Sequence, residues 1–154
     1  MLRSNLATRS ARSGFTLIEL IVVLAIIATL AALVGPELMR NTGDARRQAA
    51  AAQIELFAVA LDAYRLDTGT YPSTREGLGA LRSIPAAGAV PRNWRGPYVR
   101  RVIPDDPWGR PYVYVSPGVV NPHGYDLYSL GRDGATGGTE EDQDITSWGG
   151  EVIR

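Results

Sequence analysis

Two groups of acidic residues in this sequence could carry chemistry. Glu19 is the only charged residue in the apolar run 15–34. An isolated carboxylate in a segment of membrane length is energetically costly, so it requires a partner of opposite charge. A positive charge created by cutting the chain after Gly14 is the natural candidate. The second group lies in the glycine-rich, acidic segment 130–144.

Segment 130–144 has a composition suited to calcium. This ion takes about six to eight oxygen ligands from carboxylates and carbonyls, and glycines let a loop turn its carbonyls inward. The 12 residues 133–144 match an EF-hand loop in length. Ala135 and Gly137 stand where that loop needs oxygen ligands, and two flanking helices are not expected, so an EF-hand is excluded. A calcium site of another kind and a solvated acidic loop both remain open.

The composition excludes several classes of site. There is no cysteine, so disulfides and thiolate metal sites are absent from this sequence. The single histidine, His123, lies in a Pro-His-Gly turn, which argues against a catalytic triad or a histidine-rich zinc site. Three of the 16 basic residues lie in the first 14 positions, where there is no acid. The remainder carries 13 basic and 16 acidic residues, a net charge of −3, which does not indicate nucleic-acid binding.

Asp105 and Asp106 are the remaining candidates for acid–base chemistry. Adjacent residues on an extended chain point apart, so we do not expect a catalytic pair. Segment 105–109 predicts a turn in which Asp106 accepts hydrogen bonds from nearby backbone N–H groups. No enzyme is expected from this sequence.

The element that must position Glu19 is an apolar helix. The 20 residues 15–34 would span roughly 30 Å as a helix, the thickness of a hydrocarbon core. A signal peptide or a buried core helix is the alternative, but the apolar region of a signal peptide is usually about 7–15 residues long. We therefore predict a leader over 1–14 and a transmembrane helix over 15–39. The leader arginines would keep the N-terminal side in the cytoplasm.

The sequence after residue 34 predicts an interruption and then an amphipathic helix. Gly35-Pro36 favours a kink or local melting, and Asn41-Thr42-Gly43 is a second weak point. Asp44 is suited to the start of a helix. Apolar residues then recur at spacings of three and four as far as Asp67-Thr68-Gly69, where the helix should end. This apolar stripe consists of Ala50, Ile54, Phe57, Leu61 and Tyr64. The whole pattern predicts one long helix, from about residue 15 to residue 67.

Residues 40–154 should form a globular domain of α+β class. Segment 73–84 can make a short helix, and 98–103 a short strand or extended piece. Segments 112–115 and 125–130 are β-branched or aromatic and predict an antiparallel hairpin joined by 116–124. The aromatic side chains are interpreted as core and turn-packing groups rather than as a ligand site: Trp94, Tyr98, Trp108, Tyr112 and Tyr114.

Several motifs follow one another in an order that resembles a known family. After Gly14, the run Phe15-Thr16-Leu17-Ile18-Glu19 resembles the N-terminus of type IV pilins and pseudopilins. Further motifs are Thr68-Gly69-Thr70-Tyr71-Pro72, Gly77-Leu78, Trp94, Gly96-Pro97-Tyr98, Asp106-Pro107-Trp108-Gly109, Pro111-Tyr112, Tyr125-Asp126 and Asp144-Ile145. Together they resemble the major pseudopilins of the type II secretion system, the general secretion pathway protein G family. The resemblance covers nearly the whole chain.

This resemblance implies how the N-terminus is processed and used. A prepilin peptidase would cut between Gly14 and Phe15 and methylate the new amine of Phe15. Glu19 would then meet the N-terminal amine of a neighbouring subunit, because a carboxylate and an ammonium are each costly alone in lipid and tolerable as a pair. Pairing within one chain, or reaching toward the membrane interface, is the alternative role of Glu19.

The resemblance also implies a calcium site in segment 130–144. The expected ligands are the Leu130 carbonyl and the Asp133 and Asp144 side chains. Asp142 is a further expected ligand, and Glu140 or Glu141 is an additional candidate.

The function implied is that of a structural subunit. The precursor would sit in the inner membrane with its globular domain in the periplasm, and the processed chain would join a helical pseudopilus that drives export of folded proteins across the outer membrane. Expected partners are other copies of the chain, minor pseudopilins, the prepilin peptidase and the inner-membrane assembly platform. Two alternatives are a type IV pilin of an adhesive or motility fibre, many of which carry a disulfide that this chain cannot form, and a membrane-anchored enzyme.

Overall fold

A computed structural model describes residues 15–85, 91, 93–150 and 152 of the 154-residue chain. The predicted leader 1–14, with its cleavage position Gly14, lies outside the described residues. Internal contacts divide the chain into two units, one ending at Met39 and one beginning at Arg40. Each unit is described by itself.

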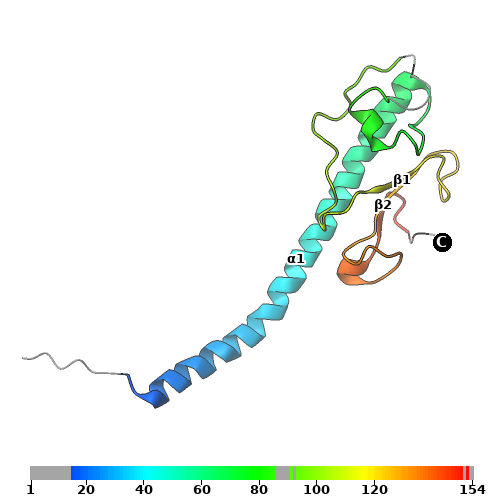
Figure 1. Ribbon diagram of the computed structural model, residues 1–154. Coiled ribbons are helices and arrows are strands. Elements are labelled where there is room, and N and C mark those ends of the chain that lie inside the picture. The colour runs from blue at the N-terminus through cyan, green and yellow to red at the C-terminus, as the bar shows by residue number, and fades with distance from the viewer. Residues whose placement is uncertain (1–14, 86–90, 92, 151, 153–154) are drawn as a thin grey trace, which may run out of the picture. The chain divides into compact units, whose positions relative to one another are not determined.

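One helix, α1 (Leu17–Thr68), contributes to both units (Figure 1). Its first part, Leu17–Val34, has a mean hydropathy of 2.9, and none of it is buried against the rest of the chain. By length and composition this part could cross a membrane. Thr16 caps the helix: its side-chain oxygen accepts a hydrogen bond from the backbone N–H of Glu19 at 3.2 Å.

Of the kink or local melting predicted at residues 35–43, local melting is absent from this structure. α1 runs without a break through residues 35–43, so Asp44 lies inside the helix instead of starting it. A single proline removes one backbone donor, and the hydrogen bonds of its neighbours still hold the helix together here. The predicted end is confirmed: α1 stops at Thr68, and Gly69, with a φ of 88°, donates its N–H to the carbonyl of Arg65 at 2.8 Å.

The second unit is built on the predicted apolar stripe of α1. All five stripe residues are buried, with exposed fractions of 2% or less for Ala50, Ile54, Phe57, Leu61 and Tyr64. Four of them, Ile54, Phe57, Leu61 and Tyr64, form one core with residues of the strands and of the short helix η1 (Leu78–Leu81). The periodicity of the sequence is confirmed because burial follows the helical repeat.

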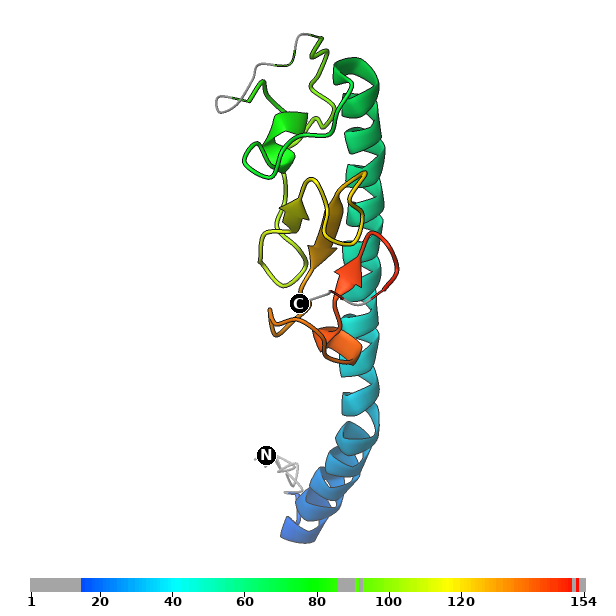
Figure 2. The same cartoon turned by 90° about the vertical axis from the view of Figure 1, so that its right-hand side faces the viewer.

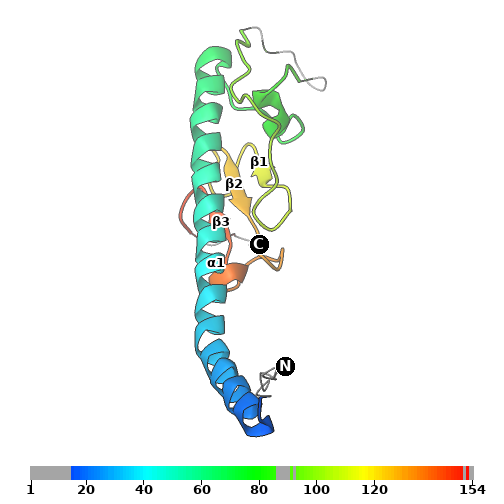
Figure 3. The same cartoon turned by 90° about the vertical axis from the view of Figure 1, so that its left-hand side faces the viewer.

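A three-stranded antiparallel sheet covers this stripe (Figures 2 and 3). Its strands are β1 (Val113–Val115), β2 (Asp126–Ser129) and β3 (Ile145–Thr146), in the order β1-β2-β3. Tyr114 lies opposite Leu127, which confirms the predicted hairpin. Strand β3 has only two residues and was not expected from the sequence.

Segment 73–103 differs from its prediction. The expected helix 73–84 is reduced to a 3-10 helix, η1 (Leu78–Leu81), preceded by a turn. Segment 98–103, predicted as a short strand or extended piece, forms no strand. Tyr98 and Val99 donate their backbone N–H groups to the Leu81 carbonyl, at 2.7 and 3.3 Å. Their hydrogen bonds therefore go to η1 and not to a strand.

The aromatic residues largely serve the core, as predicted. Tyr112 is buried and meets the Phe57 ring edge-on, with centroids 5.4 Å apart. Trp94 and Tyr98 are partly buried against the core, and the Trp94 indole donates to the Ala80 carbonyl at 3.0 Å. Trp108 is half-buried and follows Asp106 in its turn.

Asp106 is a buried carboxylate that holds a turn through backbone N–H groups. Asp106 accepts hydrogen bonds from the N–H groups of Trp108 and Arg110, at 3.0 and 2.9 Å, which confirms its predicted turn role. The Ser129 hydroxyl donates to its other oxygen at 2.5 Å. Asp106 is therefore used structurally and forms no catalytic pair with Asp105.

Asp126, at the start of β2, holds the loop that joins the hairpin strands. Its carboxylate accepts hydrogen bonds from the backbone N–H groups of Val119, Val120 and Asn121, at 2.6, 2.8 and 3.0 Å. Gly118 is required at the edge of this loop, because a Cβ there would lie 2.5 Å from the Asp126 carboxylate. The loop shape thus depends on one buried acid.

The stripe generates a matched test on one helix. Leu61→Ala should lower the free energy of unfolding by about 2–5 kcal/mol, because Leu61 is completely buried and the change leaves a cavity. Leu66→Ala, at a position 87% exposed, should change it by less than about 0.5 kcal/mol. Denaturant unfolding of the detergent-solubilised chain measures both. Equal losses would contradict the assignment of the core face.

The buried tyrosines predict loss of stability in alkali. Desolvation, with a contribution from Asp106, raises the pKa of Tyr112 to about 12. Desolvation, with contributions from Asp62, Tyr71 and Glu55, raises the pKa of Tyr125 to about 12. The unfolded chain loses these phenolic protons from about pH 10, while the folded chain keeps them.

Stability should therefore be intact below pH 10 and fall between pH 10 and 12. Equilibrium unfolding at a series of pH values, with tyrosinate absorbance as a second readout, measures the fall. Tyr112→Phe should make it less steep, because Phe has no proton to lose. A flat stability profile up to pH 12 would contradict this prediction.

Candidate assembly and metal sites

The predicted assembly site lies at the first turn of α1. Phe15 is 85% exposed, and Glu19 is exposed among apolar neighbours. Thr16 and Glu19 have the spacing of a capping box, a Thr followed three residues later by Glu. A negative charge in the first helical turn is also favoured by the helix dipole. Over the described ranges Glu19 makes no ion pair.

The acidic segment 130–144 forms a closed loop between β2 and β3. Glycines bring its two arms together: a Cβ at Gly131 would lie 2.8 Å from the Glu141 carbonyl, and one at Gly138 would collide with the carbonyl of Asp142. Both glycines have positive φ, 63° and 89°. A 3-10 turn, η2 (Glu140–Asp142), precedes β3.

The structure places the predicted metal ligands in different situations. Asp133 accepts a hydrogen bond from the Ala135 N–H at 3.0 Å, within its own turn. Asp142 forms a two-point ion pair with Arg132, at 2.9 and 3.1 Å, so it is not available as a ligand in this arrangement. Leu130 directly follows β2. Among the described residues, no three acidic or histidine side chains form a cluster with metal-binding geometry.

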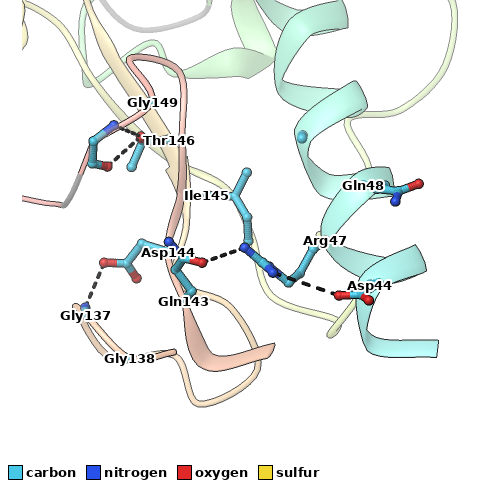
Figure 4. A pocket seen from close by; sticks show the side chains of 12 residues that line it. Asp44, Arg47, Gln48, Gly137, Gly138, Gln143, Asp144, Ile145, Thr146 and Gly149 are labelled. Atoms are coloured by element: carbon cyan, nitrogen blue, oxygen red, sulfur yellow. Dashed lines mark hydrogen bonds and ion pairs between the residues drawn. The ribbon is translucent and has the colours of Figure 1, made fainter. Parts of the chain in front are cut away.

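Asp144 is the ligand candidate that best fits a cation. One carboxylate oxygen accepts a hydrogen bond from the Gly137 N–H at 2.8 Å (Figure 4). The other oxygen is buried and has no hydrogen-bond partner in the described chain. A buried carboxylate oxygen requires a donor, a water or a cation. The donor set of this loop, carboxylates and carbonyls, is the one that calcium prefers.

Arg110 supports this loop and was missed by the sequence reasoning. Its guanidinium donates to the carbonyls of Gly131, at 2.9 Å, and of Arg132. Its backbone is held in turn by Asp106. The contact joins residues 21 and 22 positions apart. No local sequence pattern signals such a pairing.

A pocket of about 510 Å³ is lined by residues of the loop and of α1 (Figure 4). Arg47 extends across it from α1 and donates to the side-chain oxygen of Gln143 at 2.5 Å. Asp44, Gln48 and Asp144 also line the pocket. Within the described chain, these side chains provide no nucleophile paired with a base.

The architecture defines a class of protein before any comparison. An exposed apolar segment runs into a helix whose later part packs one stripe on a small antiparallel sheet. This is the pilin-like arrangement, in which the helix begins apolar on every side and then becomes one-sided.

Comparisons with known proteins agree with this class. Residues 37–148 match the family model described as type II secretion system protein G, and residues 9–35 match the prokaryotic N-terminal methylation motif. The type II secretion system core protein G of Pseudomonas aeruginosa is 46% identical over 140 residues, covering 91% of this chain and 97% of that protein. The Escherichia coli K12 core protein G is 46% identical, covering 88% and 90%.

A solved structure is similar as well. The major pseudopilin from the type 2 secretion system of enterohaemorrhagic Escherichia coli aligns with a TM-score of 0.60 and 41% identity, over 73% of this chain and 95% of that one. The chain therefore belongs to the type II secretion system protein G family. It is a structural pseudopilus subunit, not an enzyme, and the apolar helix indicates anchoring in a membrane. The type IV pilin alternative is not what these similarities support.

Proposed function

We propose that this subunit is cut between Gly14 and Phe15 by a prepilin peptidase, and that the new amine of Phe15 is methylated. The methylation motif over residues 9–35 supports this proposal. So does the position of Thr16, which caps α1 just after the cut. The new N-terminus then emerges directly at the start of a formed helix.

The observation that carries the assembly mechanism is the placement of Glu19. It stands in the first turn of a helix whose next residues are apolar and exposed over Leu17–Val34. The amine that cleavage creates at Phe15 of a neighbouring copy neutralises it. A register that leaves either charge unpaired in lipid is disfavoured, so the pair selects how neighbouring helices align.

The mature subunit adds to a helical fibre at the inner membrane. Its exposed apolar segments bundle together, and its second unit lies in the periplasm. Head-to-tail contacts that do not close produce a filament. Growth of the fibre drives folded proteins through the outer membrane. The assembly platform and minor pseudopilins are its partners in this process.

The loop 130–144 binds calcium in this proposal. Asp144 supplies the unpaired buried oxygen, Asp133 a second carboxylate and Leu130 a carbonyl. Asp142 takes part only if it releases Arg132. The ion would neutralise the acids of the loop and join its two arms. Extracellular calcium modules bind at about 10⁻⁴ to 10⁻³ M, in keeping with a site outside the cytosol.

The assembly step is tested with Glu19→Gln, which keeps the shape of the side chain and removes its charge. The variant should be inserted and processed normally. Its fibre yield should fall about 100-fold or more, because an unpaired ammonium in lipid costs about 3–5 kcal/mol. Fibres are counted by electron microscopy after co-expression with the assembly machinery, and mass spectrometry reads the N-terminus.

Glu55→Gln is the matched control, since it removes the same charge from an exposed position further along α1. It should leave the fibre yield unchanged. Normal fibres from Glu19→Gln would contradict the pairing. A mature N-terminus other than methylated Phe15 would contradict the processing site.

The metal site is tested by melting the full-length chain in detergent with calcium and with a chelator. Calcium at about one hundred times its dissociation constant should stabilise the folded chain by about 2.7 kcal/mol, so chelation should lower the melting temperature. Asp133→Ala and Asp144→Ala should each remove that difference. The Asp62→Ala variant, an acid on α1 outside the loop, should keep it. Identical melting temperatures with calcium and with chelator would contradict the proposed calcium site.

A further inference from the structure

Gly43 occupies a position on α1 where any added side chain would displace Glu141. It is buried, and a Cβ built there would lie 2.5 Å from Cγ and from Oε1 of Glu141. The Glu141 side chain therefore lies directly on the bare helix backbone. Glycine is unfavourable inside a helix compared with alanine, so this close approach gives the residue a structural reason.

The carboxylate of Glu141 is held between two arginines. Its Oε2 lies 3.7 Å from Nη1 of Arg46 on α1 and 4.0 Å from Nη1 of Arg132 in the loop. The Glu141 side chain is 20% exposed, whereas the Arg46 and Arg132 side chains are 51% and 58% exposed, so only the carboxylate end of each pair is shielded from water. The backbone of Glu141 also accepts the N–H of Arg132 at 2.8 Å.

A second contact lies one residue further along the helix. Arg47 donates to the side-chain oxygen of Gln143 at 2.5 Å (Figure 4). Gln143 itself donates its backbone N–H to the Glu140 carbonyl at 3.3 Å, which closes the η2 turn. The consecutive helix residues Arg46 and Arg47 thus contact Glu141 and Gln143 of the same turn.

These contacts alternate in sequence with the metal-ligand candidates. Glu141 and Gln143 face α1, while Asp142 pairs with Arg132 and Asp144 bonds to Gly137 within the loop. A cation bound at Asp144 would restrain the residue that follows Gln143, while the Arg132 pair restrains Asp142 before it. The same few residues then carry both the ion site and the helix contact.

The helix needs external support at this place. Residues 35–43 include Gly35, Pro36 and Gly43, which are poor helix formers, so intrinsic propensity contributes little to their helical order. Helices in proteins draw most of their stability from tertiary packing. One described contact that supports this stretch is that of Glu141 with Gly43 and Arg46.

We propose that Gly43, Arg46 and Glu141 form a latch that couples the ion in loop 130–144 to the order of α1. Opening of the helix around Gly43 requires release of the loop, and a bound ion opposes that release. This inference rests on the proposed calcium site. Coupling of this kind is reciprocal, so weakening the latch from the helix side must also weaken calcium binding.

Hydrogen exchange of the full-length chain in detergent, followed by mass spectrometry, tests the latch. Calcium at one hundred times its dissociation constant should slow exchange of the amides 43–49 by about 100-fold, if opening requires loss of the ion. Amides 20–30 of the apolar segment should exchange at the same rate with calcium and with chelator. Calorimetry measures calcium affinity separately.

Two variants break the latch from opposite sides. Gly43→Ala places a methyl group under Glu141, and Glu141→Gln removes the charge between the arginines. Each variant is measured with chelator and with calcium at one hundred times its own dissociation constant. Calcium should slow exchange of the amides 43–49 in each variant by less than about threefold. Gly43→Ala should also weaken calcium binding although glycine offers no ligand, and its amides should be better protected without calcium because alanine favours the helix.

Glu55→Gln is the control on the same helix and should behave as the unaltered chain. Slowing confined to 130–146, with calcium bound, would overturn the latch and leave the metal site standing. No heat of calcium binding would overturn the metal site and the latch together. Unchanged affinity and undiminished slowing in Gly43→Ala would overturn the coupling alone.

Discussion

The globular unit depends on one contact, the burial of a single stripe of α1 under a very small sheet. The three strands have only three, four and two residues, too few to be stable without a helix to cover. The stripe supplies the core, with Leu61 completely buried at its centre and Leu127 completely buried opposite it. The same helix exposes apolar residues on every side over Leu17–Val34. One continuous helix therefore has two kinds of surface. Its first part exposes apolar residues to lipid or other copies, and its later part packs one apolar stripe on the chain's own sheet.

Carboxylates hold the loops of the globular unit in place, a role that disulfides have in many small domains. The chain has no cysteine. Asp106 holds the turn before β1 and accepts a hydroxyl from β2, while Asp126 holds the hairpin loop. Asp144 and Glu141 tie the last loop to itself and to α1. Each of these acids accepts hydrogen bonds or faces arginines, and buried carboxylates are stable in proteins only with such partners.

The sequence predicts the elements that repeat and misses those that depend on distant contacts. The stripe of α1 and the β1-β2 hairpin follow from apolar spacing, and the turn at Asp106 follows from local chemistry. No strand forms at 98–103, predicted as a short strand or extended piece, because Tyr98 bonds to η1, and β3 is too short to leave a pattern. The motifs of the N-terminus and of the loop point to Glu19 and Asp144. The loop contact of Arg110 and the helix contact of Glu141 were not predicted, since Gly131 and Arg46, the partners in those contacts, lie 21 or more residues away in the chain.

The way Asp126 holds its loop has a consequence for how this surface can change. All three of its contacts with residues 119–121 that reach the backbone are made to N–H groups, which every residue except proline provides. The side chain of Val119 meanwhile points away and is 71% exposed. The backbone shape of the loop 119–121 therefore does not depend on which side chains the loop carries. The outward side chains of the loop can therefore change while one aspartate keeps the backbone the same.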